Sequence, residues 1–154
     1  MDSLLVTLIP LMFLIFFPLF WCAIVFLISR FGWAQLADEF ATDRGVPSDG
    51  EVSQFQSMRL GSLFLGRNYN NIVTIGVSEK GLFLGPSLFL FRVGHRDLLI
   101  PWSKIDRIEP GTFLWFATNT LEIRGGYSSM TIYRSTGHAV RERWEAETSR
   151  KARP

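Results

Sequence analysis

Cysteine and histidine are scarce in this sequence of 154 residues, which contains one cysteine, Cys22, and two histidines, His95 and His138. One cysteine excludes an intramolecular disulfide framework. The histidines are far apart and Cys22 lies within an apolar segment, so the sequence offers no clustered ligands for a metal ion. The formal net charge of +2 is too small to indicate a nucleic-acid-binding surface. We therefore expect no metal, no other cofactor and no nucleic-acid partner.

Charge is absent between Leu4 and Ile28, where the sequence is LLVTLIPLMFLIFFPLFWCAIVFLI. An apolar run of about 18 or more residues predicts a transmembrane helix, and prolines such as Pro10 and Pro18 are tolerated in such helices. A cleaved signal peptide would need a basic N-terminal region and an apolar core of about 7–15 residues, and this segment has neither. We expect an uncleaved single-pass anchor that bends at its prolines without breaking.

Five aromatic side chains are crowded into the middle of this anchor: Phe13, Phe16, Phe17, Phe20 and Trp21. We expect them to face lipid, or to pack against the helices or bound pigments of a partner. The distribution of Lys and Arg indicates the orientation, because these residues favour the cytoplasmic side of a membrane. The N-terminal flank has none, whereas Arg30 and Arg44 follow the anchor. We expect the N-terminus outside and the C-terminal domain in the cytoplasm.

The chain divides into a transmembrane anchor at 1–30, a juxtamembrane segment at 31–55 and a β domain at 56–154. In the juxtamembrane segment, four apolar residues fall on one face of a predicted short helix, namely Trp33, Leu36, Ala37 and Phe40. This helix is expected to lie on the membrane surface or continue the anchor, or else to pack on the domain that follows. An acidic linker rich in turn residues is expected after it.

From about Gln56 the apolar residues alternate or form short runs between turn residues, which predicts an antiparallel domain of about seven strands. A turn is expected at 67–71, since asparagine tolerates left-handed backbone geometry. A C-terminal helix of about 12 residues, capped by Ser135 or Thr136, is expected to follow the sheet. The strand-like segments lie at 58–65, 72–77, 82–84, 88–92, 98–101, 105–108, 113–117, 120–124 and 130–133.

Two stretches match enzyme motifs only in part. His95-Arg96-Asp97-Leu98 is the start of a protein-kinase catalytic loop, but the metal-binding Asn of that loop would fall at Trp102. The glycines at 61–68 are spaced as in a phosphate-binding loop, but Arg67 and Asn68 stand where Lys and Ser or Thr are required. The sequence offers no catalytic set, and we expect a protein that is not an enzyme.

A family resemblance lies in the middle of the chain. The strand–turn–strand pattern at 72–84, an apolar segment, and then LIPWSKIDRI at 99–108 resemble bacterial pleckstrin-homology-like (PH-like) domains. The similarity extends over about residues 56–148 and includes the terminal helix with Trp144. It implies a seven-stranded, strongly bent antiparallel sheet or barrel with a helix over one open end. It also implies a protein of the bacterial inner membrane that binds lipid or protein, or acts as a scaffold.

The segments 88–91 and 113–116 are apolar on both faces of their predicted strands, although a small bent sheet has one core face. We expect them to be covered by other parts of the chain, or to meet lipid or another protein. Arg92, His95 and Arg96 form a basic corner after the first segment. In contrast, Arg67 is the one basic residue in the loop that corresponds to the phosphoinositide-binding loop of PH-like domains. The candidate contact residues are Phe89, Phe91, Arg92, His95, Arg96, Trp115, Phe116 and Arg67.

Two hypotheses of function follow from these features. The first is a non-catalytic accessory or scaffold subunit that docks on a larger inner-membrane protein complex through its transmembrane helix and its PH-like domain. The second is a membrane-surface sensor whose PH-like domain binds anionic lipid head groups. Both hypotheses make the lipid bilayer a partner, and they differ in what the domain itself contacts.

Overall fold

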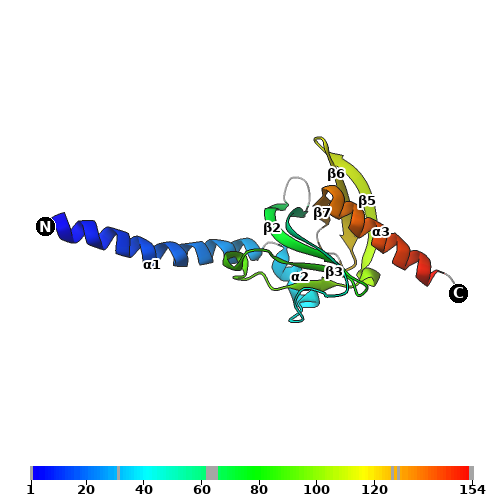
Figure 1. Cartoon of the computed structure of the whole chain (residues 1–154), viewed down its shortest axis with the longest axis horizontal. Helices are drawn as coiled ribbons and strands as arrows, with labels where there is room; N and C mark the ends of the chain where they lie inside the picture. The colour runs from blue at the N-terminus through cyan, green and yellow to red at the C-terminus, as the bar shows by residue number, and fades with distance from the viewer. Residues whose placement is uncertain (1, 31, 62–65, 126, 128, 153–154) are drawn as a thin grey trace.

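The computed structural model describes residues 2–30, 32–61, 66–125, 127 and 129–152, with side chains from residue 8 onward. A long N-terminal helix leads into a small domain built on one sheet, and a helix ends the chain (Figure 1). The helices are α1 (Asp2–Ser29), α2 (Trp33–Phe40) and α3 (Arg134–Lys151), with single 3-10 turns at η1 (Phe89–Phe91) and η2 (Trp102–Lys104). The strands are β1 (Glu51–Leu60), β2 (Arg67–Val77), β3 (Leu82–Pro86), β4 (Leu98–Ile100), β5 (Ile105–Phe113), β6 (Phe116–Ile123) and β7 (Met130–Tyr133).

The seven strands form one antiparallel sheet in the order β4-β3-β2-β1-β7-β6-β5. The sheet curls into a half-barrel, and α3 packs against β6 and β7 (Figure 1). The predicted fold class is confirmed: an N-terminal apolar helix precedes a mainly-β, PH-like bent sheet that a C-terminal helix caps.

The hydrophobic core lies on the inner face of the curled sheet. Alternate residues of each strand point into it because successive side chains of a strand face opposite sides. Leu84 of β3 and Ile132 of β7 are fully buried there. Helix α3 adds Val140 and the half-buried Trp144, whose indole Nε1 donates a hydrogen bond to the Ile105 carbonyl at 3.1 Å. The terminal helix is therefore attached to the sheet by both apolar burial and a directed hydrogen bond.

The joint between β4 and β5 has the predicted structure. Strand β4 is an edge strand and ends at Ile100, and Pro101, which has no backbone donor, precedes η2. The indole of Trp102 is buried, and its Nε1 donates to the Ser78 carbonyl at 2.9 Å. Trp102 therefore connects the β4–β5 joint to the turn between β2 and β3.

Helix α2 packs on the domain, which decides between the alternatives that its amphipathic pattern left open. Trp33, Leu36 and Phe40 are buried in the common core. Ala41, directly after the helix, forms an isolated bridge with Leu98 of the edge strand β4. Glu39 accepts hydrogen bonds from Lys104 and Tyr127, which lie on the other side of the half-barrel opening. The helix thereby covers the open edge of the sheet.

The starts of β1 and β2 differ from prediction, because hydrogen bonding between strands tolerates polar side chains. Strand β1 begins at Glu51, although its outer residues are polar. The expected turn at 67–71 is wrong, because Asn68 and Tyr69 pair with β1. The left-handed tendency of asparagine appears instead as an irregularity in β2, where Asn71 has φ +54°. The predicted strand positions 62–65 lie outside the described residues.

The first doubly apolar segment is not a strand, which corrects the prediction for 88–92, and the strand predicted at 113–117 is interrupted by a turn at Leu114 and Trp115. Local hydrogen bonds from the Phe91 and Arg92 amides to the Leu88 and Phe89 carbonyls form η1 instead of a ladder. The second segment is the tip of the β5–β6 hairpin, with Leu114 at φ +54°. Helix α3 begins at Arg134, before the predicted caps, and extends for 18 residues.

Helix α1 is continuous through Pro10 and Pro18, as predicted. Its segment Leu8–Ser29 is long and apolar enough to cross a membrane, and no other helix among the described residues meets that criterion. At ~1.5 Å per residue, 28 residues extend for about 42 Å, more than the ~30 Å hydrocarbon core of a bilayer. Length and composition thus make α1 a candidate membrane span with several residues to spare.

Replacing Trp102 with alanine should lower the free energy of unfolding by about 3–5 kcal/mol, because a buried indole is lost from the core. Trp115 is a matched control, since 83% of its surface is exposed and its replacement should change stability by less than about 0.5 kcal/mol. Denaturant unfolding of both variants in detergent solution measures the difference. Equal stabilities for the two variants would contradict the structural role of Trp102.

Candidate functional site

The end of α1 is in direct contact with the domain. Val25 and Ser29, which lie one turn apart, are each 1% exposed. Gly94, before β4, has φ +74°, and a Cβ atom there would lie 2.4 Å from the Ser29 hydroxyl oxygen. Only glycine satisfies both the left-handed backbone and this close approach. The segment before β4 is therefore held against the last turn of the anchor.

The next residue, His95, is an internal residue of this junction. Its ring lies between Trp33 and Tyr69, with ring centroids 5.1 and 5.6 Å away, and it is 5% exposed. The Nε1 atom of Trp33 donates to the Arg96 carbonyl at 2.9 Å. His95 was a candidate for contact with lipid or a partner, and the structure places it where it presents almost no surface to either.

A cavity of about 210 Å³ lies beside His95, between the end of α1 and strand β2. The hydroxyl of Tyr69 and the Nε2 atom of His95 are buried without a hydrogen-bond partner among the described residues. Burial raises the pKa of Tyr69 to about 12 and lowers the pKa of His95, although backbone carbonyls near Nδ1 oppose the second shift. Both side chains are therefore neutral near pH 7, and the cavity is large enough for water that would satisfy them.

The segment 88–93, here called the η1 loop, lies beside α1. The ring of Phe91 meets Trp21 edge-on with centroids 5.6 Å apart, while Phe89 and Leu90 are 83% and 61% exposed. Loop and helix enclose an open apolar cleft of about 540 Å³. Its lining residues are Phe17, Pro18, Trp21, Cys22, Phe89, Leu90, Arg92 and Val93.

The aromatic residues of the anchor form two rows on the helix. Phe13 stacks on Phe17 at 5.2 Å and Phe17 on Trp21 at 6.3 Å, so that one row leads directly to Phe91 of the η1 loop. Phe16 and Phe20 form the second row, with centroids 6.1 Å apart. Their exposed rings are available to lipid or to another helix.

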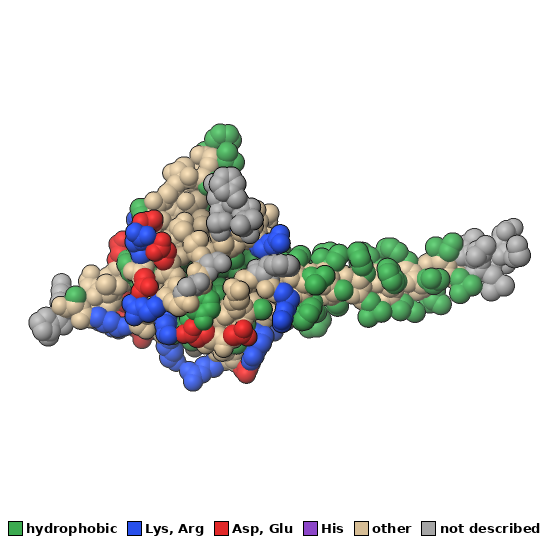
Figure 2. Space-filling view, turned by 180° about the vertical axis from the view of Figure 1, so that it is seen from behind, with side chains coloured by type: hydrophobic (Ala, Val, Ile, Leu, Met, Phe, Trp, Pro, Cys, Tyr) green, Lys and Arg blue, Asp and Glu red, His purple; other side chains and the backbone are tan. Residues whose placement is uncertain are grey.

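The predicted basic corner is divided between two environments. Arg92 lines the cleft beside α1, whereas Arg96 forms an ion pair with Asp43 at 3.2 Å on the surface. Arg67 begins β2, opposite Leu60. Arg30 lies over the Phe26 ring at the end of α1, with its guanidinium carbon 5.8 Å from the ring centroid. Lys and Arg side chains lie beside the point where α1 leaves the domain, and others lie along the lower and far parts of the domain (Figure 2).

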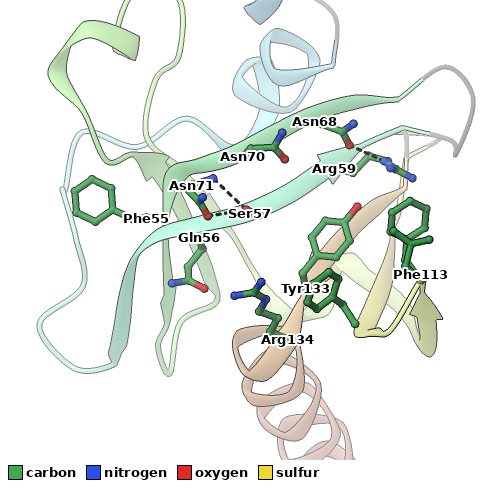
Figure 3. A pocket seen from close by; sticks show the side chains of 12 residues that line it. Phe55, Gln56, Ser57, Arg59, Asn68, Asn70, Asn71, Phe113, Tyr133 and Arg134 are labelled. Carbon is green, nitrogen blue, oxygen red and sulfur yellow. Dashed lines mark hydrogen bonds between the residues drawn. The ribbon is translucent and has the colours of Figure 1, made fainter.

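A second concave surface lies away from α1, between the outer face of β1–β2 and the tip of the β5–β6 hairpin (Figure 3). This groove has a volume of about 290 Å³. It is lined by amide, hydroxyl, guanidinium and aromatic side chains, and no acidic residue is among them. The lining residues are Phe55, Gln56, Ser57, Arg59, Asn68, Asn70, Asn71, Phe113, Leu114, Phe116, Tyr133 and Arg134.

The two arginines of the groove are held in place by neighbouring side chains. The guanidinium carbon of Arg59 lies 5.0 Å from the Phe113 ring centroid, and that of Arg134 lies 4.7 Å from the Phe116 centroid. Arg59 Nε also donates to the Asn68 side-chain oxygen at 2.7 Å. Cation–π contacts restrict the guanidinium groups without neutralising their charge. Both arginines can therefore bind an anionic group of a ligand, to which their guanidinium N–H groups would donate hydrogen bonds.

Backbone strain is concentrated around this groove. Among the described residues, four non-glycine residues have positive φ angles, and all four line it: Phe55, Asn71, Leu114 and Arg134. Such conformations are unfavourable for residues with a side chain and tend to cluster at functional sites. Of the candidate contact residues predicted from the sequence, Phe116 lines the groove, whereas Arg59 and Arg134 were not predicted. The asparagine-rich run at 68–71 was the available signal, and it was interpreted as a turn.

Searches for related proteins give no assignment for this site: no protein-family model matches the chain, and no curated protein matches it. No group of three or more potential metal ligands occurs within the part of the chain that the structure describes. The role of the groove and of the η1 loop is therefore inferred from the side chains that line them and from their contacts.

The buried His95 predicts a pH-dependent stability. Its pKa in the folded protein lies below the usual 6.5, so the unfolded chain binds a proton more readily and folding weakens as the pH falls below 6.5. His95→Phe, which keeps a ring of similar shape, should reduce this loss. Thermal unfolding of both proteins between pH 8 and pH 5 measures the effect. An unchanged pH dependence in the variant would show that His95 does not carry it.

Proposed function

We propose that this chain is a non-catalytic accessory or scaffold subunit of a larger protein complex in a bacterial inner membrane. In this proposal α1 is its single transmembrane helix, and the PH-like domain lies in the cytoplasm and contacts the partner. The observation that carries the proposal is the groove and its aromatic hairpin tip, which lie to one side of α1 and are uncovered in the isolated chain (Figure 1).

The hairpin tip has the composition of a protein-binding anchor. Trp115 is 83% exposed and Leu114 is 65% exposed, and the apolar tip projects from the domain (Figure 2). Aromatic and arginine side chains dominate the binding energy of protein interfaces. Since the tip points sideways from α1, a bilayer crossed by α1 does not cover it (Figure 1). The occupant that fits is another protein.

The groove supports a more specific description of the partner. Two guanidinium groups, three asparagines and no acidic residue line it, so it suits a segment that carries a carboxylate. The amide side chains of Asn68, Asn70 and Asn71 can donate to and accept from the main chain of an extended peptide. We therefore expect an acidic, extended segment of the partner to contact Arg59 and Arg134.

The proposed orientation is supported by charge. Arg30 lies over Phe26 in the last turn of α1, and Arg92 lines the cleft beside Trp21 and Cys22, in the C-terminal half of the helix. Lys and Arg close to a membrane span favour the cytoplasmic side. The folded structure therefore adds Arg92, which is distant in sequence, to the basic flank that follows the anchor.

A membrane-surface sensor is the second candidate, and it is favoured by the position of Arg92 in the cleft beside α1. In that case anionic lipid would purify with the protein and be lost from Arg92→Glu, because charge reversal repels the head group. Mass spectrometry of lipids retained by the wild type and by the variant would separate this candidate from the accessory-subunit proposal.

Mild purification from native membranes tests the proposed function. The wild-type protein should migrate as part of a complex of higher mass, and Trp115→Asp should weaken that association by about 30-fold, since loss of an interface anchor costs about 2 kcal/mol or more. Val46→Asp is a matched control, because Val46 is also an exposed apolar residue but lies in the linker. A wild-type protein that purifies only as a monomer would refute the proposal.

A further inference from the structure

The η1 loop is the second apolar surface of the domain, and its position differs from that of the hairpin tip. It runs alongside α1, where Phe91 contacts Trp21 and Gly94 contacts Ser29. No residue of η1 is buried, and Leu88 and Val93 on either side of it are 40% and 37% exposed. An apolar loop is thus held against the anchor by Phe91, while Phe89 and Leu90 remain exposed.

The length of α1 places this loop at the membrane boundary. The candidate span Leu8–Ser29 includes Trp21, and the helix from Asp2 to Phe20 rises about 28 Å, close to the ~30 Å thickness of a hydrocarbon core. Tryptophan side chains favour the level of the lipid head groups. Since Phe91 contacts Trp21, the η1 loop lies at that same depth, where head groups meet acyl chains.

The charges around the loop fit this depth. Arg92 lines the cleft between the loop and α1, and Arg30 lies over Phe26 at the end of the helix. Long basic side chains at this level extend toward lipid phosphates while their stems remain in apolar surroundings. The remaining lining of the cleft is apolar, with Phe89 and Leu90 facing Trp21 and Cys22 across it. Acyl chains match that surface, and water does not.

We infer that the η1 loop is a second membrane-inserted element, which enters the leaflet at the C-terminal end of α1. Its occupant is bilayer phospholipid, with acyl chains against Phe89 and Leu90 and phosphate near Arg92. Two attachments, the spanning helix and the loop beside it, then fix the side of the domain that faces the membrane. The inference depends on α1 spanning the bilayer and does not depend on any protein partner.

The purified full-length protein in phosphatidylcholine–phosphatidylglycerol vesicles provides the test. In a Cys22→Ser background, Leu90→Cys and Leu114→Cys place one environment-sensitive fluorophore at two leucines of nearly equal exposure, 61% and 65%. Leu14→Cys, within α1, reports insertion of the anchor itself. Phe89→Cys and Trp115→Cys, both at 83% exposed positions, repeat the comparison in case labelling disturbs one site.

The label at residue 90 should show blue-shifted emission and should be quenched by lipids with a nitroxide near the head group. Aqueous iodide should quench it at least threefold less than it quenches the label at residue 114. The label at residue 89 should differ from the label at 115 in the same way. If residue 14 is protected while residues 89 and 90 are as open to iodide as 114 and 115, the inference is overturned. That outcome leaves the proposed complex intact, because its test measures co-purification.

Discussion

The arrangement of this molecule depends on the short segment 94–96, which is held by two helices at once. Gly94 approaches Ser29 of α1 so closely that a Cβ atom has no room, and the Arg96 carbonyl accepts the indole hydrogen bond of Trp33 from α2. His95, between them, packs against Trp33. Because these contacts attach the anchor to the domain, the direction of α1 determines the direction of every surface on the domain.

The two exposed apolar surfaces have different surroundings as a result. The η1 loop is parallel to the anchor and shares its environment, whereas the β5–β6 hairpin projects to the side, into the aqueous phase if α1 spans a bilayer (Figure 1). The strained residues and the stacked arginines occur at the hairpin side. In our proposal, lipid contacts the loop and a protein contacts the groove.

The general architecture was predictable because it depends on local patterns. The apolar length of the anchor, the period of Trp33, Leu36 and Phe40, and the Pro101–Trp102 joint each specify structure over a few residues. The η1 loop was mistaken for a strand, and the turn at Leu114 and Trp115 was not predicted, because an apolar run has no period that distinguishes a strand from an exposed turn. The groove was not predictable, since Arg59, Asn71 and Arg134 come together only through the strand order and its irregular register.

The contacts that hold α1 against the domain have a consequence for affinity. A partner could contact this protein at two sites, the aromatic rows of α1 and the groove. These two sites are held at a fixed spacing. Once the first contact forms, the second occurs at a high effective concentration, so two individually weak contacts give a long-lived complex. The same geometry discriminates strongly, because a protein that offers both contacts at the wrong spacing engages only one of them.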